Sequence, residues 1–173
     1  MPRPLDPASS RRPQLRSWRR LGLGLLGASL ALLAIGCTRP PEMTLPDEFV
    51  SLEEPGRDYE ERRTNAHGVI VAVRTIDNEV EGSLAFWVET IREGLRTQGG
   101  YALLEDAPFE AASGETGHQL RFGRDRDSQP HLYWLTIFVR DDRIYLIEAG
   151  GRQERFEEAQ PQIEAMLAST RLP

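Results

Sequence analysis

The chain has 173 residues and a formal net charge of −6, with 27 acidic against 21 basic side chains. The charge is unevenly distributed, because residues 1–36 carry six Arg and one Asp, a net charge of +5, which leaves −11 for residues 37–173. An acidic body is repelled by phosphate backbones, so the composition excludes a nucleic-acid-binding protein and a basic membrane-docking face. Its length suits one domain with its own hydrophobic core.

The N-terminal residues follow the plan of a secretory signal peptide. Five arginines between residues 11 and 20 stand before an apolar run from Leu21 to Ile35, which is followed by Gly36 and Cys37, the chain's single cysteine. A basic region, an apolar region and a small-residue cleavage site in that order are typical of such signals. As a helix the run would span roughly 22 Å, short of the ~30 Å hydrocarbon core, which disfavours a permanent transmembrane helix.

Residues 33–37, Leu-Ala-Ile-Gly-Cys, resemble the lipobox of bacterial lipoproteins, although Ala34 stands where Leu is usual. The resemblance implies cleavage of a signal peptide, residues 1–36, between Gly36 and Cys37, with diacylglyceryl and palmitate-type chains on Cys37. It also implies a lipid-anchored protein of the bacterial cell envelope, facing the periplasm or the exterior. The alternatives are an uncleaved anchor and a secreted protein with an unmodified cysteine. In either case the cysteine would stand at the end of the apolar run only by chance.

Residues 37–47 are predicted to be a tether after the lipidated cysteine, because Pro40, Pro41 and Pro46 interrupt a stretch with few apolar residues. Residues 48–173 are predicted to be one folded domain. Alternating or continuous apolar patterns between turn signals predict its strands. They are expected at 48–52, 58–64, 68–76, 101–107, 118–124, 131–140 and 143–150, with a loop over 108–117 and a two-residue turn at Asp141-Asp142.

Two helices are expected from the 3.6-residue spacing of apolar side chains. The first begins after Ser83, a good N-cap, and ends before Gly99-Gly100. The second spans about 155–169, and Pro161 would be tolerable in it only within the first turn, where backbone N–H groups lack helical partners. Its apolar face contains Phe156, Ala159, Ile163, Met166 and Leu167.

The strand Leu132–Val139 is apolar on both faces, with Trp134 and Phe138 in one row and Leu135 and Ile137 in the other. A strand of this kind lies within a sheet that is covered on both sides. We therefore expect an α+β sandwich, in which helices cover a mainly antiparallel sheet of six or seven strands.

This order of elements resembles the PsbP-like family, which includes DcrB-like envelope proteins. The resemblance covers roughly Leu45–Leu172 and is carried by Tyr145–Ala149, Phe156 and Ile163–Leu172. It implies a sheet between helices and a binding or assembly role without catalysis, and it supplies no catalytic residues.

We find no clear catalytic, metal-binding or cofactor-binding motif in the sequence. His67, His118 and His131 are scattered at predicted strand starts, without the spacing of metal ligands, so we expect neither a metal site nor a cofactor. The prediction is a non-enzymatic binding or assembly module, held in the membrane by its lipid and contacting another envelope protein. Two alternatives stay open: a periplasmic hydrolase whose site converges from distant residues, and a carrier of a small apolar ligand.

A binding site is predicted beside Arg121, Arg124 and Arg126, three arginines within six residues of an acidic chain. Arg121 should point away from the inward-facing Leu120 and Phe122, and the other two should follow in the adjoining turn. Guanidinium groups at a strand end suit the recognition of carboxylates. The alternative is an ordinary exposed turn in which neighbouring aspartates neutralise them.

Overall fold

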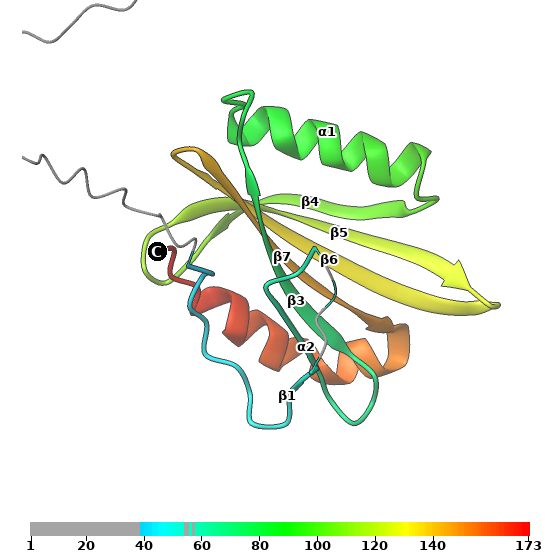
Figure 1. Cartoon of the computed structure of the whole chain (residues 1–173). Coiled ribbons are helices and arrows are strands. Elements are labelled where there is room, and N and C mark those ends of the chain that lie inside the picture. The colour runs from blue at the N-terminus through cyan, green and yellow to red at the C-terminus, as the bar shows by residue number, and fades with distance from the viewer. Residues whose placement is uncertain (1–38, 54–55, 57) are drawn as a thin grey trace, which may run out of the picture. The chain divides into compact units, whose positions relative to one another are not determined.

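The computed structural model describes residues 39–53, 56 and 58–173 (Figure 1). The predicted signal peptide and Cys37 lie outside the described residues. In the described part, a seven-stranded sheet has a helix on each face, and every pair of neighbouring strands is antiparallel. The predicted α+β sandwich with a mainly antiparallel sheet is therefore confirmed.

The strands form a sheet in the order β1-β2-β3-β7-β6-β5-β4, which leaves β1 and β4 at the edges. In chain order the elements are β1 (Val50–Ser51), β2 (Glu61–Thr64), β3 (Ile70–Asp77), α1 (Leu84–Thr97), β4 (Ala102–Glu110), β5 (Thr116–Arg126), β6 (Gln129–Arg140), β7 (Arg143–Arg152) and α2 (Gln153–Ala168).

Two strands are longer than the sequence predicts. The expected loop over 108–117 is wrong at both ends, because β4 runs to Glu110 and β5 begins at Thr116. Pro108 is tolerated since β4 is an edge strand, where a missing N–H need not break a ladder. The hairpin between β5 and β6 turns at Asp127 and Ser128, whose φ angles of 52° and 60° are those of a tight two-residue turn. The two-residue turn at Asp141-Asp142 is confirmed by the pairing of Arg140 with Arg143.

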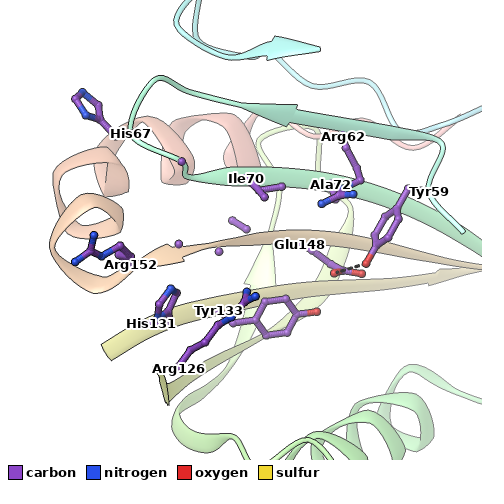
Figure 2. Close-up of a pocket in the computed structure, with 14 residues that line it drawn as sticks. Tyr59, Arg62, His67, Ile70, Ala72, Arg126, His131, Tyr133, Glu148 and Arg152 are labelled. Atoms are coloured by element: carbon purple, nitrogen blue, oxygen red, sulfur yellow. Dashed lines mark hydrogen bonds between the residues drawn. The ribbon is translucent and has the colours of Figure 1, made fainter. Parts of the chain in front are cut away.

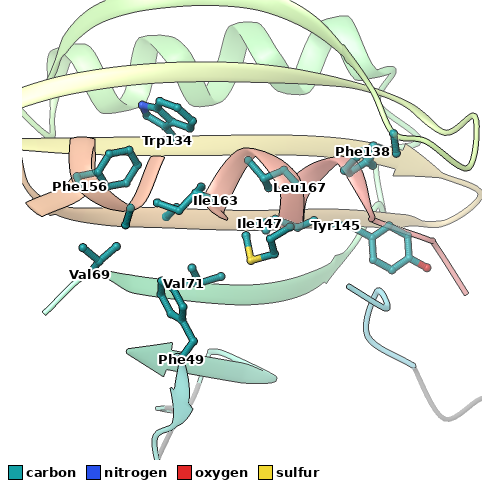
Figure 3. Packing of buried hydrophobic residues seen from close by; sticks show 14 residues of the cluster. Phe49, Val69, Val71, Trp134, Phe138, Tyr145, Ile147, Phe156, Ile163 and Leu167 are labelled. Carbon is teal, nitrogen blue, oxygen red and sulfur yellow. The ribbon is translucent and has the colours of Figure 1, made fainter. Parts of the chain in front are cut away.

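The two rows of β6 enter two separate cores, as predicted. Trp134 and Phe138 pack in the cluster beneath α2, seen in Figure 3, and Leu135 and Ile137 pack in the cluster beneath α1. The apolar face predicted for α2 is buried in full.

Helix α2 begins two residues earlier than expected, at Gln153. Pro161 lies in the helix interior and not in the first turn, to which the sequence analysis restricted it. Proline there removes the hydrogen bond to the carbonyl four residues earlier. The helix nevertheless continues, because its other face buries five apolar side chains against the sheet, among them Phe156 and Ile163.

Helix α1 covers only part of its face of the sheet. It begins at Leu84, after Ser83, whose side chain accepts a hydrogen bond from the Phe86 backbone N–H at 3.2 Å. It packs on β4, β5 and β6, whereas β2 and β3 lie beyond it at the other side of the sheet. This uncovered region contains the candidate site.

Part of the predicted tether packs on the domain. Met43 and Leu45 lie against the cluster beneath α2, and Glu42 forms an antiparallel bridge with Arg171, near the end of the chain. Packing Met43 and Leu45 against the domain removes their apolar surface from water, which favours this arrangement of the segment. Within the described residues, no helix is long and apolar enough to cross a membrane.

Candidate functional site

A pocket of about 410 Å³ opens on the sheet face that α1 leaves partly uncovered (Figure 2). We call it the sheet pocket. Its floor contains Ile70 and Ala72 of β3, Gly150 of β7 and Tyr133 of β6. Its polar lining comes from Tyr59, Arg62, His67, Arg126, His131, Glu148 and Arg152.

The hollow follows from one glycine. Side chains alternate along a strand, so Ile144, Leu146, Glu148, Gly150 and Arg152 share the row of β7 that faces α1. Ile144 and Leu146 are buried in the cluster beneath α1. Gly150 has no side chain, so the surface is lower at its position. It lies between its register partners Ile70 and Tyr133, and a Cβ there would stand 3.5 Å from Cδ2 of Tyr133.

Glu148 is the buried charge of the pocket, with 8% of its surface exposed. Its Oε1 lies 2.7 Å from Nη2 of Arg74, and the Tyr59 hydroxyl donates to its Oε2 at 3.4 Å. A carboxylate in such surroundings requires a partner, because an isolated buried charge is very unfavourable. Arg74 therefore neutralises Glu148 from β3.

Two phenols adjoin this ion pair. Burial, followed by the charge of Glu148, raises the pKa of Tyr133 and, to a smaller extent, the pKa of Tyr59. Both hydroxyls therefore stay protonated at neutral pH and act as hydrogen-bond donors. Arg62 lies over the Tyr59 ring, with its guanidinium carbon 5.2 Å from the ring centroid.

The opposite end of the pocket is cationic. Arg126 ends β5, Arg152 ends β7, and His131 is the register partner of Arg152. In Figure 2 Arg126 extends toward the ring of Tyr133. Positive groups that line a concavity focus the local potential, so this pocket attracts anions although residues 37–173 carry a net charge of −11.

The three predicted arginines do not converge. Arg121 faces α2, with its guanidinium carbon 3.8 Å from the Trp134 ring centroid and its Nη1 3.1 Å from Oε2 of Glu105. Arg124 lies on the other face, 4.6 Å from the centroid of the Tyr101 ring. Arg126, from the same face as Arg124, lines the sheet pocket. All three belong to β5 and none to a turn, because the strand continues to the hairpin at Asp127.

The pocket also brings together two histidines that the sequence analysis treated as scattered. His67 and His131 both line it, whereas His118 lies near the other edge of the sheet, with its Nε2 2.5 Å from Oδ1 of Asp106. Within residues 39–53, 56 and 58–173, no three side chains of His, Cys, Asp or Glu gather into a possible metal site.

The Asp106 cluster predicts a pH dependence of stability. Hydrogen bonds from His118 and then from Arg92, at 2.9 Å, hold the pKa of Asp106 below its ordinary value. A carboxyl group with a lowered pKa in the folded state contributes stability above the unfolded pKa of about 4, and the contribution is lost as pH falls through the folded pKa.

We therefore expect Asp106→Asn to flatten the fall in unfolding free energy below about pH 4, with a cost at pH 7 of no more than about 1 kcal/mol because the group is partly exposed. Urea titrations between pH 7 and pH 2 measure this, and Asp125→Asn, in the exposed β5–β6 hairpin, is the control. Parallel curves for Asp106→Asn and the unmodified protein would contradict the assignment.

No family model matches the chain, and no curated protein matches it in sequence. Among solved structures, the Mycobacterium tuberculosis protein LpqN, which is described as involved in cell envelope biogenesis, has a TM-score of 0.64 at 10% identity, with 81% of this chain and 88% of LpqN covered.

Two further structures are similar. A Pseudomonas aeruginosa protein of unknown function, a putative regulator, has a TM-score of 0.55 at 10% identity over 80% of this chain and 87% of its own. The cyanobacterial PsbP protein of Synechocystis has a TM-score of 0.54 at 8% identity over 87% of this chain and 99% of its own. At such identities the likeness concerns the fold alone, and this chain therefore has the PsbP-like fold.

Proposed function

We propose that the chain is a lipid-anchored binding module of the bacterial cell envelope and that the sheet pocket holds its ligand without catalysing a reaction. The observation that carries the proposal is the pocket itself, a concavity with an apolar floor and a few convergent polar groups. Its partners would be the membrane, through the lipid on Cys37, and another envelope protein.

The states of the carboxylate and the two phenols in the lining support binding over catalysis. The one carboxylate in the pocket, Glu148, is ion-paired with Arg74, and the pKa values of Tyr59 and Tyr133 are raised. Groups in these states orient a ligand through charge and hydrogen bonds but are poorly suited to remove a proton near neutral pH. The envelope setting is supported by the resemblance of residues 33–37 to a lipobox and by the involvement of LpqN in cell envelope biogenesis.

The ligand is tested with the full-length protein extracted from its own membrane in mild detergent. Native mass spectrometry should detect a small molecule bound to the protein. Gly150→Val would fill the pocket, and Ile70→Trp would narrow it from β3, so either variant should lose this mass. Thr90→Trp, on the exposed surface of α1, is the control that should retain it. Retention of the mass by both folded pocket variants would overturn the proposal.

The anchor is tested at Cys37. We expect Cys37→Ser to remain an uncleaved precursor that incorporates no fatty-acid analogue, since a serine hydroxyl does not replace the thiol that receives the lipid. Metabolic labelling followed by gel electrophoresis measures both effects, with Thr38→Ser as the control. Normal acyl labelling of Cys37→Ser would show that the anchor lies elsewhere.

A further inference from the structure

We infer that the sheet pocket takes an amphiphilic anion, a ligand with a flat apolar body and one carboxylate or phosphate group, bound with the anion at the Arg126 and Arg152 end. This inference rests on the proposed function and names the ligand class for the same pocket. It is carried by the arrangement of charge along β7 and by the bare floor at Gly150.

The two arginines at this end are available to a ligand. Nε of Arg126 lies 3.9 Å from Oδ2 of Asp127, and both side chains are mostly exposed, at 66% and 93%. An exposed pair at that distance contributes little, so a ligand anion can replace the aspartate. Arg152 is exposed and forms no ion pair with any residue in the described part of the chain. Guanidinium groups bind carboxylates and phosphates through paired hydrogen bonds.

The buried ion pair determines which way the ligand lies. Glu148 and Arg152 are four residues apart in the same row of β7, a separation of about 13 Å along a strand. Near Glu148, a ligand anion would be repelled by the carboxylate, and Arg74 is already ion-paired with that carboxylate. The anion is therefore favoured at the Arg152 end, because Arg74 and the hydroxyls of Tyr59 and Tyr133 already surround the Glu148 carboxylate at the other end.

The space between the two ends suits an apolar body. Gly150 presents backbone without a side chain, Ile70 borders it from β3, and the ring of Tyr133 borders it from β6. A flat ring system can lie over the glycine and contact the tyrosine ring, a contact that aromatic groups favour. The volume of about 410 Å³ falls within the range of small-molecule sites.

The probe is 8-anilinonaphthalene-1-sulfonate, and N-phenyl-1-naphthylamine is its uncharged analogue with the same ring system. Fluorescence titration of the purified full-length protein should give a dissociation constant at least about tenfold lower for the sulfonate than for the amine, since a hydrogen-bonded charge contributes that much or more. The difference should shrink as salt is added.

Competition then separates the two sources of the anion. 1-Naphthoate and 1-naphthyl phosphate should each displace the sulfonate, and 1-naphthalenemethanol should displace it poorly. Stronger displacement by the naphthoate assigns a carboxylate ligand, and stronger displacement by the naphthyl phosphate assigns a phosphate ligand. Displacement by the alcohol as strong as that by both anions would overturn the inference.

The variants locate the anion. Arg126→Gln with Arg152→Gln should weaken sulfonate binding on the order of a hundredfold and leave amine binding within about twofold. Arg140→Gln with Arg171→Gln is the matched control: it removes the same charge, and Arg140 lies beside Asp141 at 3.9 Å in the other hairpin, as Arg126 lies beside Asp127. Circular dichroism and thermal unfolding establish that both pairs of variants fold.

The results distinguish the ligand class from the proposed function. If Gly150→Val and Ile70→Trp abolish binding of both probes but the Arg126 and Arg152 variant binds the sulfonate as well as the control does, the pocket function stands and the anionic ligand class is wrong. If neither probe binds, the ligand class is wrong, and the mass bound by the unmodified protein and its pocket variants decides the pocket function. If the filled pocket still binds both probes, the pocket is not the binding site and both proposals fail.

Discussion

Trp134→Ala should lower the free energy of unfolding by about 3–5 kcal/mol, the usual range for a buried aromatic side chain. Trp134 is 4% exposed and contacts the ring of Phe156 edge-on, with the centroids 5.0 Å apart. Its other side is covered by the guanidinium of Arg121. Truncation would remove the Trp134 contact with Phe156 of α2 and leave a cavity that neighbouring rings cannot fill without moving.

Urea denaturation at pH 7 measures this loss. Phe138→Ala, at a site with no exposed surface and a neighbour in Phe109, should lose a similar amount. Leu104→Ala, at a side chain that is 60% exposed on the edge strand β4, is the control and should change stability by less than about 0.5 kcal/mol. A loss of well under 1 kcal/mol at both aromatic sites would mean that this face of β6 does not pack in a core beneath α2.

Arg74→Met should cost about 2–4 kcal/mol, because it leaves the Glu148 carboxylate buried without its cationic partner. The side chain of Glu148 is 10% exposed, whereas that of Arg74 is 32% exposed. An unpaired Glu148 is therefore more unfavourable than an unpaired Arg74 would be. The double variant Arg74→Met with Glu148→Met should recover most of the loss, because replacing both members of a buried pair by apolar residues is often close to neutral.

The matched control is Arg63→Met on β2. Arg63 pairs with Glu61 at 2.5 Å, but both side chains are about 30% exposed, at 31% and 30%, so we expect a cost below about 1 kcal/mol. Chemical denaturation of the four proteins gives the comparison. If Arg74→Met and the double variant are equally unstable, the cost comes from the packing of the arginine and not from the isolated charge.

The sequence predicted those parts of the architecture that depend on a single residue pattern. The two apolar rows of Leu132–Val139 predicted a strand between two cores, and the spacing of Phe156, Ile163 and Leu167 predicted the buried face of α2. Boundaries were predicted less well, since Pro108 and Pro161 read locally as interruptions. Tertiary contacts of Phe109 and of the buried face of α2 override that local preference.

The pocket could not be predicted because it depends on strand order. His67 precedes β3 and His131 lies near the start of β6, and both border the end of β7 only because β7 lies between those two strands. The distance of 64 positions between the histidines gives no sign of this. The opposite holds on β5, where Arg121, Arg124 and Arg126 are close in sequence but do not share one face. Successive side chains of a strand point to opposite faces of the sheet.

The bridge between Glu42 and Arg171 also has a consequence for how the domain would stand on a membrane. It holds the N-terminal segment beside the C-terminal end of α2, and α2 begins at Gln153, next to Arg152, 16 residues or roughly 24 Å away. The lipid that we propose on Cys37, five positions before Glu42, would be attached on the side of the C-terminal end of α2. The Arg126 and Arg152 end of the pocket lies at the other end of this helix, so the proposed anchor leaves that end open to a ligand from solution.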